Sequence, residues 1–245
     1  MTYDGIRVDV AADRVVVTLD RPEVKNAIDA AMVDSLHAVC ADLERDPKPM
    51  VVIGGTEVFA AGADIAQLRA RDRVDALAGI NSGLFDRIAR LPMPTVAAVS
   101  GPAIGGGAEL AYACDFRVAT PSVRFANPEG QLGILAAAGA AWRLPELVGE
   151  PLAKEVLLAG RSISASQALA VRLVNEVVEP DALLETAHAW VDRILRAAPL
   201  ATRLTKLALR TPREAHPVFD NLAQAVLFET TEKRERMTAF LERKK

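Results

Sequence analysis

The sequence has few cysteines and few aromatic residues, and neither sign of charge dominates it. Two of its 245 residues are cysteines. This argues against a disulfide scaffold, so we expect Cys40 and Cys114 to be buried free thiols in a reducing compartment. Aromatic residues make up 4% of the chain, and the formal net charge is −3. Nucleic-acid-binding surfaces need basic patches and aromatic rings that stack on bases, so we expect no nucleic-acid partner.

Long hydrophobic runs are also missing. The longest apolar stretch extends only from Leu132 to Trp142 and includes two glycines, whereas about 20 apolar residues are needed to span a bilayer. The first residues carry no basic flank and no apolar segment, so no signal peptide is indicated. We expect a soluble, cytoplasmic protein without a membrane partner.

Several catalytic motifs are absent from the chain. The three histidines are scattered without a serine or cysteine partner, and Gly-x-Ser-x-Gly does not occur, which argues against a serine hydrolase. No cluster of cysteine, histidine or acidic residues has the spacing of a metal site. We therefore expect neither a metal nor a redox cofactor.

The chain does contain enough apolar residues, 51% of the total, for a large core. Apolar or alternating runs predict strands at residues 6–10, 14–19, 50–55, 95–100, 116–119 and 173–178. Helical periodicity predicts helices at residues 28–43, from about 65, at 80–91, after the glycines at 105–107, and at 153–158, 165–170, 183–198, 200–209 and 218–241. This order predicts a mainly parallel α/β core over residues 1–190, built from related β-β-α turns, and a helical extension over 191–245.

The glycine-rich turn Gly105-Gly106-Gly107 lies between a predicted strand and a predicted helix. Such a turn offers bare backbone N–H groups at a helix N-terminus, where a phosphate, a carboxylate or an oxyanion is favoured. A P-loop would need Lys-Ser/Thr after the last glycine, and a dinucleotide fingerprint would need a glycine where Leu110 stands. Neither phosphate motif fits.

Two acidic residues stand near such turns. Glu109 lies in the first turn of the apolar helix, where compensation of the helix dipole is a sufficient explanation for an isolated acid. A catalytic role gains weight only if a second acid and a second N–H donor exist elsewhere. Asp64 follows the small-residue loop Ala61-Gly62-Ala63, and we interpret it as an N-cap rather than a catalytic acid.

Together, the two small-residue loops carry a resemblance to a known family. The segments Phe59-x-Ala61-Gly62-Ala63-Asp64-Ile65 and Gly105-Gly106-Gly107-Ala108-Glu109-Leu110 resemble those of the crotonase, or enoyl-CoA hydratase/isomerase, superfamily. Further similar segments are Leu19–Pro22 with Asn26-Ala27, Cys114–Arg117, Phe125–Gly130, Ser162–Ala165 with Ala168, Val174–Val178, Glu229-x-Thr231-Glu232 and Ala239-Phe240. The resemblance spans nearly the whole chain and implies the crotonase-like spiral of β-β-α turns.

The resemblance implies an acyl-CoA thioester site. The amides of Ala63 and Gly106 would form an oxyanion hole for the thioester oxygen, and two backbone donors fixed in advance stabilise charge that develops in the transition state. Glu109 and Glu129 match the two acids with which hydratases of the superfamily add water across the 2,3 double bond of a 2-trans-enoyl-CoA. Apolar neighbours would make idle buried acids costly. CoA would enter only as part of the substrate.

The resemblance also implies residues that bind CoA. Lys25 lies where the family approaches the CoA nucleotide, and a solvated surface lysine is an equal alternative. Ala61, Asp64 and Ile65 are the other CoA-binding candidates. By the same analogy we expect a homotrimer or a hexamer, with the C-terminal helices closing the CoA pocket.

One segment departs from the family pattern. Hydratases commonly carry Pro-Gly-Ala-Gly-Gly where this chain has Ala136-Ala137-Ala138-Gly139-Ala140, followed by Trp142. Alanine keeps the backbone N–H, but its Cβ could crowd the water site. The leading interpretation is an enoyl-CoA hydratase of fatty acid metabolism. The alternatives are an enoyl-CoA isomerase, which needs only the oxyanion hole and one acid/base, and a non-catalytic acyl-CoA-binding paralogue.

Overall fold

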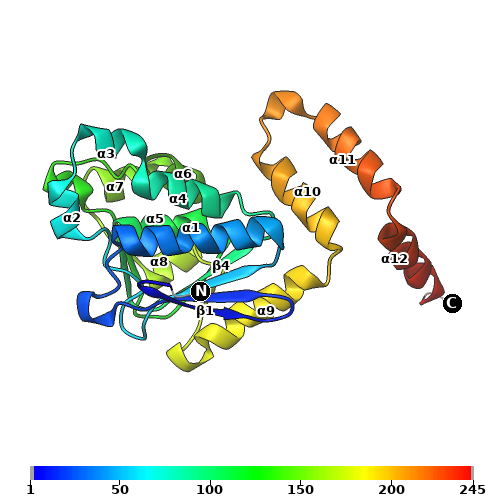
Figure 1. Ribbon diagram of the computed structural model, residues 1–245, viewed down its shortest axis with the longest axis horizontal. Coiled ribbons are helices and arrows are strands. Elements are labelled where there is room, and N and C mark those ends of the chain that lie inside the picture. Colours follow the sequence, from blue (N-terminus) through cyan, green and yellow to red (C-terminus); the bar gives the residue numbers. More distant parts are fainter. Residues whose placement is uncertain (1–2, 244–245) are drawn as a thin grey trace.

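The computed structural model describes residues 3–243, which form a mixed α/β body and an arm of helices (Figure 1). The body is built on a six-stranded sheet in the order β1-β2-β3-β4-β6-β9. β1 and β2 form an antiparallel hairpin, and the later pairs of this sheet are parallel, as predicted. The strands are β1 (Ile6–Val10), β2 (Val15–Leu19), β3 (Met50–Ile53), β4 (Thr95–Val99), β6 (Phe116–Ala119) and β9 (Glu176–Val177).

The central strand β4 is apolar on both faces because both faces are covered. Ala97 and Val99 belong to the main core, which includes residues of α1 (Ala30–Arg45) and α4 (Ile80–Ala89). Val96 and Ala98 pack in a second cluster with α9 (Leu183–Leu195). This double burial explains why the strand reads as a continuous hydrophobic run rather than as an alternating one.

Three short strands form a second sheet, and its first strand follows β4 in the sequence. It contains β5 (Pro102–Ile104), β7 (Arg124–Ala126) and β8 (Ile163–Ser164), in the order β5-β7-β8. The chain turns from β4 into β5 at Gly101, which has φ +61° and whose added Cβ would overlap the carbonyl oxygen of Glu57. The sequence of strand, strand and helix follows twice, as β4-β5-α5 (Gly106–Ala113) and as β6-β7 followed by the 3-10 helix η2 (Glu129–Leu132) and α6 (Ala140–Val148).

Three of the very short strands show no pattern in the sequence. β5, β7 and β8 have two or three residues each, too few to show a period of two. The helix predicted from about residue 65 is divided into α2 (Ile65–Ala70) and α3 (Arg73–Ala78), because Asp72 accepts hydrogen bonds from the amides of Val74 and Asp75 and starts a new helix. α6 was not predicted, since an alanine-rich segment with Pro145 inside it shows no clear helical pattern.

The C-terminal third is helical, as predicted, with one difference. The continuous helix expected over residues 218–241 is wrong: α11 (Val218–Phe228) and α12 (Thr231–Glu242) are separate, because Thr230 caps α12 by accepting from the amide of Lys233. The other helices of this region are α7 (Glu150–Leu157), α8 (Ala165–Ala170) and α10 (Pro199–Arg210). The region also contains two 3-10 helices, η3 (Pro180–Ala182) and η4 (Arg213–Ala215). A further 3-10 helix, η1 (Pro22–Val24), precedes α1 near the start of the chain. No helix within residues 3–243 has both the length and the apolar composition that a membrane span requires.

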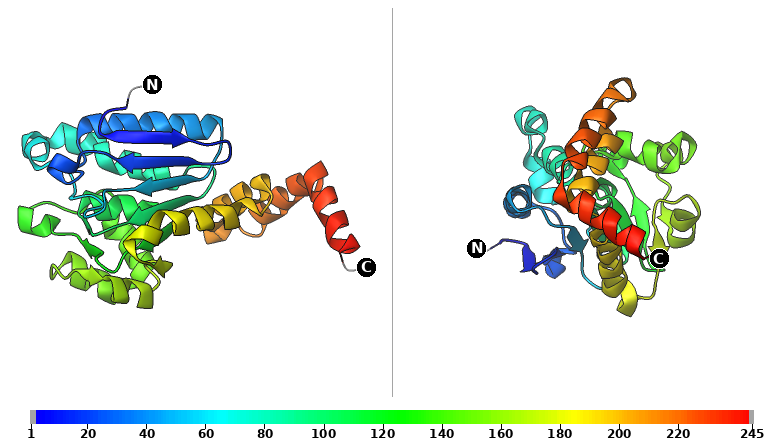
Figure 2. Two further views of the ribbon diagram at one scale, coloured as in Figure 1. Left: turned by 90° about the horizontal axis from the view of Figure 1, so that it is seen from below. Right: turned by 90° about the vertical axis from the view of Figure 1, so that its right-hand side faces the viewer.

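Helices α10 to α12 form an arm that extends away from the body (Figure 2). The arm is attached through α10, where buried Lys206 donates to the carbonyl of Met93 at 3.1 Å and lies 2.6 Å from the Asp115 carboxylate. α11 and α12 contain no buried residue. The expected boundary between core and extension, at residue 190, falls inside α9, which packs on the sheet through Val191. Residues 1–2 of the expected core and 244–245 of the expected extension lie outside the described residues.

Helix α5 is buried along its whole length and approaches the chain before α2 very closely. A Cβ on Gly107 would overlap the carbonyl oxygen of Ala60 and lie 2.7 Å from the Ala60 Cβ. Only glycine therefore permits this approach of helix to backbone. By contrast, a Cβ on Gly83 in α4 would meet no atom within 4 Å.

Two glycine-to-alanine changes should therefore have opposite effects on stability. We expect Gly107→Ala to lower the free energy of unfolding by about 2–3 kcal/mol, because the methyl group forces the backbones apart. Gly83→Ala should raise it by about 0.5–1 kcal/mol, because alanine is the better helix former at an open position. Urea unfolding followed by circular dichroism measures both. Equal effects of the two changes would contradict the close approach.

Candidate active site

A cavity of about 570 Å³ lies where the two small-residue loops meet. Six of the predicted site residues line it: Ala61, Ala63, Ile65, Gly106, Glu109 and Glu129. The opposite wall comes from α2, α3 and the start of α4, including Arg71, Asn81 and Ser82. The fold thus brings together residues that are far apart in the sequence.

The other two predicted site residues lie outside the cavity wall. Asp64 caps α2, with its carboxylate accepting from the amide of Gln67 at 3.1 Å, as its interpretation as an N-cap predicted. Lys25 is exposed, and its carbonyl accepts from the amide of Ala61 at 3.0 Å. The Lys25 backbone therefore fixes the loop, and the proposed contact of its side chain with CoA stays a prediction.

The amides of Ala63 and Gly106 lie next to each other. A Cβ added to Gly106 would be 3.4 Å from the Ala63 nitrogen, and a Cβ added to Gly62 would be 3.7 Å from the Gly106 nitrogen. The absence of side chains at both glycines leaves this space open to a ligand.

Within residues 3–243, neither of these two amides donates a hydrogen bond. The flanking amides have acceptors: Asp64 N–H donates to Ile28 at 3.0 Å, and Gly105 N–H donates to Ala126 at 2.8 Å. The amides of Ala63 and Gly106 have no acceptor among the described residues. Gly106 is also the first residue of α5, whose N-cap supplies no side-chain acceptor, so the helix dipole adds to the attraction for negative charge.

Glu109 is a buried acid, 3% exposed, one turn into α5. One carboxylate oxygen accepts from the amide of Ala140 at 3.0 Å. Burial raises the pKa of Glu109 to about 7, and the negative charge of Glu129 acts in the same direction. The amides of Ala140 and Ala138 and the charge of Arg143 lower this pKa and limit the rise.

Glu129 opens the 3-10 helix η2 and is 9% exposed. Its Oε1 accepts from the Asn127 amide group at 3.4 Å, and the Tyr112 hydroxyl donates to the other end of Asn127 at 3.3 Å. Its Oε2 is buried and has no hydrogen-bond partner among the described residues. Burial raises the pKa of this carboxyl as well. A Cβ on Gly105 would lie 2.9 Å from Oε1, so glycine at this position makes room for the acid.

The structure adds residues to which the sequence analysis gave no role. Asn127 and Tyr112 orient Glu129. The only sign of this in the sequence is an asparagine two residues before the acid, and the structure shows that this side chain is buried. The amide of Ala140 holds Glu109; the sequence shows that alanine keeps an N–H group in that segment, but not where the group points. Backbone donors leave no trace in side-chain patterns, so this contact was not predictable.

Residues 3–243 contain neither a cluster arranged as a metal site nor an exposed thiol. No group of three or more His, Cys, Asp or Glu residues in the described chain is arranged to hold a metal ion. Cys40 and Cys114 are free and buried, as predicted, and burial raises their pKa values to about 12 and about 11. Both thiols therefore stay protonated and unreactive.

Because the pKa of Glu109 is raised in the folded protein, the free energy of unfolding depends on pH. Because the folded protein binds this proton more tightly than the unfolded chain, the protonated acid stabilises the fold below pH 4.5, and this stability is lost as the pH rises toward 7. We expect Glu109→Gln to gain stability relative to the parent between pH 4.5 and 8, by on the order of 3 kcal/mol. Urea titrations at several pH values measure the gain, with Glu155→Gln on α7 as the exposed control. A difference that does not vary with pH would contradict the burial of an ionisable group here.

The chain matches a known family along nearly its whole length. The family model described as enoyl-CoA hydratase/isomerase matches residues 11–245. The short-chain-enoyl-CoA hydratase of Clostridium acetobutylicum is 35% identical over 254 aligned residues, which cover 100% of this chain and 97% of that protein. The crotonyl-CoA hydratase of Syntrophomonas wolfei is 34% identical, with 100% and 98% covered.

Solved structures agree with this match. A crystal structure described as enoyl-CoA hydratase subunit I of Geobacillus kaustophilus superposes with a TM-score of 0.92 at 34% identity, covering 98% of this chain and 96% of that one. The predicted fold class is confirmed by this likeness. The chain belongs to the enoyl-CoA hydratase/isomerase family, the crotonase superfamily that its two paired loops resemble.

Proposed function

We propose that this protein is an enoyl-CoA hydratase that adds water across the 2,3 double bond of a 2-trans-enoyl-CoA. The full-length relatives named as enoyl-CoA and crotonyl-CoA hydratases support this assignment. The observation that carries it is the single cavity that holds two unused backbone amides and two buried acids. Each half of this arrangement has a separate task in hydration.

The amides of Ala63 and Gly106 would bind the thioester carbonyl oxygen. During the reaction this oxygen gains negative charge as the enolate forms, and the α5 N-terminus lies beside it. Donors that are already in place need no reorganisation at that moment, and losing one such donor costs about 3 kcal/mol. Both donors are main-chain groups, so a side-chain substitution cannot remove them.

Glu109 and Glu129 would handle water and protons. One ionised carboxylate takes a proton from water as the water oxygen bonds to C3, and the π electrons move toward C2 and the carbonyl. The other carboxyl, protonated, then delivers its proton to C2. A pKa of about 7 lets Glu109 hold either protonation state near neutrality, which suits a reversible addition.

The isomerase alternative has a weaker basis. Moving a double bond from C3 to C2 needs the oxyanion hole and a single acid/base, which would leave the second buried acid without a task. Keeping an unused acid buried is costly. A non-catalytic acyl-CoA-binding role leaves both acids unexplained. Hydration uses both free amides and both buried acids.

Crotonyl-CoA hydration tests the proposal directly. We expect loss of the enoyl absorbance with the parent protein, and a decrease in kcat of about 10²- to 10⁴-fold for both Glu109→Gln and Glu129→Gln. Glu155→Gln, which changes an exposed carboxylate on α7, should match the parent. A 3-enoyl-CoA is assayed in parallel. Rapid isomerisation without hydration, or a Glu129→Gln variant as active as the parent, would defeat the two-acid mechanism.

CoA would enter only as part of the substrate, and no separate cofactor would be needed. Ala61 and Ile65 line the cavity. Asp64 precedes Ile65 in the sequence, and the Lys25 carbonyl accepts from the Ala61 amide. We assign these four residues to the CoA portion of the substrate. We also propose that the protein works in the cytoplasm.

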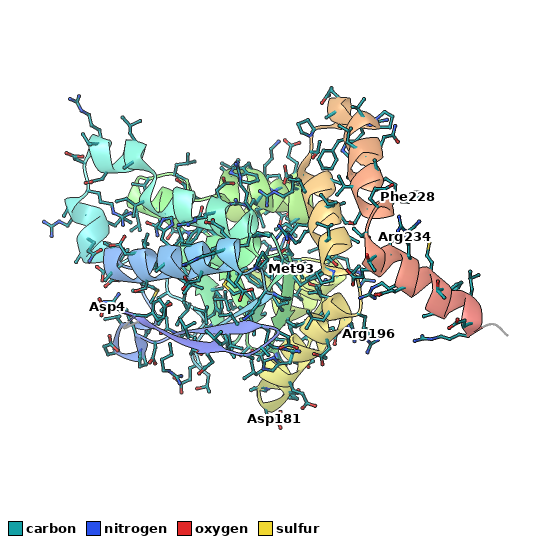
Figure 3. The ribbon with its side chains drawn as sticks, turned by 45° about the vertical axis from the view of Figure 1, so that its right-hand side comes forward. Asp4, Met93, Asp181, Arg196, Phe228 and Arg234 are labelled. Carbon is teal, nitrogen blue, oxygen red and sulfur yellow. The ribbon has the colours of Figure 1, made fainter. Side chains whose placement is uncertain are left out.

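We propose further that the protein is a homo-oligomer, a trimer or a hexamer. Helix α11 carries Val218, Leu222 and Val226 at a spacing of four, and all three are exposed. Figure 3 shows Phe228 and Arg234 on the arm, away from the body. An apolar stripe on an arm that leaves its own body needs a partner surface, and a second copy of the chain supplies one.

The stripe predicts the effect of charge on assembly. The parent should elute and scatter light as a trimer or hexamer, whereas Leu222→Glu combined with Val226→Glu should shift the protein toward monomers. Leu158→Glu, at an exposed position outside the arm, is the matched control and should leave the mass unchanged. Size-exclusion chromatography with light scattering gives the mass. A monomeric parent would overturn the oligomer proposal.

A further inference from the structure

Arg143 in α6 is a buried charged residue that the proposed mechanism does not use. It is 5% exposed, and the Trp142 ring lies 4.0 Å from its guanidinium carbon. One guanidinium nitrogen donates to the carbonyl of Ala138 at 3.3 Å, and the other lies 3.4 Å from the Asp86 carboxylate. An arginine is retained in a protein interior only where its donors are satisfied.

The carbonyl that Arg143 holds belongs to the turn that binds Glu109. Ala138, Gly139 and Ala140 are consecutive, and the amide of Ala140 donates to the Glu109 carboxylate at 3.0 Å. Gly139 has φ +131°, and a Cβ there would overlap the Arg143 guanidinium. The turn, the arginine and the acid therefore form one packed unit.

We propose that Arg143 is a positioning residue for Glu109: it fixes the Ala138–Ala140 turn, and the turn fixes the carboxylate. The inference rests on the proposed catalytic role of Glu109. Arg143 contacts neither the cavity nor a reacting atom, because it is not among the residues that line the cavity. Its effect on catalysis is transmitted by the backbone.

The Arg143 charge also acts on the same acid. It lowers the pKa of Glu109, while burial and the charge of Glu129 raise it. On its other side Arg143 is near Asp86, Glu146 and Arg210. Removing the guanidinium therefore removes a positive charge near Glu109. It also removes a support for the turn whose Ala140 amide donates a hydrogen bond to Glu109, and both losses raise the pKa of Glu109.

Asp86 links this unit to the C-terminal arm. Its carboxylate lies 3.9 Å from Arg210 of α10, and Arg210 also donates to the carbonyl of Ala89. The same carboxylate lies 2.8 Å from Arg90, an exposed residue that follows α4. Arg90 thus shares the partner of Arg143 but forms no hydrogen bond to the Ala138–Ala140 turn among the described residues, which makes it a matched control.

The test compares Arg143→Met, Arg143→Lys and Arg90→Met in the full-length chain. We expect Arg143→Met to lower kcat for crotonyl-CoA by on the order of tenfold to a hundredfold, since a misplaced catalytic group loses that much. The limb of the pH profile of kcat/KM that reports Glu109 should move to higher pH. Arg143→Lys should restore part of both effects because it keeps the charge. Arg90→Met should match the parent.

A titration independent of turnover separates this inference from the proposed function. Carbon-13 NMR of labelled glutamate carboxyls, assigned with Glu109→Gln, gives the midpoint of Glu109 directly. A higher midpoint in Arg143→Met than in the parent supports the inference even if the parent fails to hydrate crotonyl-CoA. An unchanged midpoint with an unchanged pH profile overturns it, whatever the loss of thermal stability. If Arg143→Met does not fold, Arg143→Lys provides the comparison, and a smaller rise of the Glu109 midpoint is then expected because the charge is kept.

Discussion

The close approach of two backbone segments is the constraint on which the site depends. Parallel β3 and β4 pair Val51 with Val96, so the loops that follow these strands leave the same edge of the sheet. The loops then meet where Gly62 and Gly106 carry no side chains, and Gly107 lies against the Ala60 carbonyl. Without this contact the two free amides would not share a cavity. The parallel strands direct the two loops to the same edge of the sheet, and the glycines allow the two backbones to approach each other closely.

The two acids depend on the same rigid arrangement, and each uses the backbone differently. Glu109 is a buried residue of α5 that accepts a hydrogen bond from the Ala140 amide, so its carboxylate has a fixed direction. Glu129 lies over the bare Gly105 and is held more loosely through Asn127. Burial raises both pKa values, which brings the acids toward the working range of acid/base catalysis. Desolvation is therefore both a cost to folding and the source of the acids' reactivity.

Elements formed by interactions between residues close in the sequence could be predicted, whereas those that depend on residues far apart in the sequence could not. The hairpin, α1 and α8 were found because their patterns are local and periodic. The short strands β5, β7 and β8 are held by pairing with one another, and no local pattern marks them, whereas the two-residue β9 falls within a longer apolar run that predicted a strand. The four residues proposed as oxyanion donors and acids were found through resemblance, because spacing alone left Glu109 explained by the helix dipole. The Ala140 amide and Arg143 were not found, since both act through contacts made in three dimensions.

The alanine-rich segment shows why a departure from a family pattern need not remove a function. The amide of Ala140 reaches Glu109, and a methyl group on the same residue does not interrupt that hydrogen bond. Gly139 is different, because its φ of +131° and its contact with Arg143 exclude any Cβ. Alanine is therefore tolerated where the backbone alone acts, and glycine is kept where the conformation requires it. The segment therefore departs from the family pattern at Ala140 while its amide still reaches Glu109, and it keeps glycine at 139, where the backbone turns with positive φ beside Arg143.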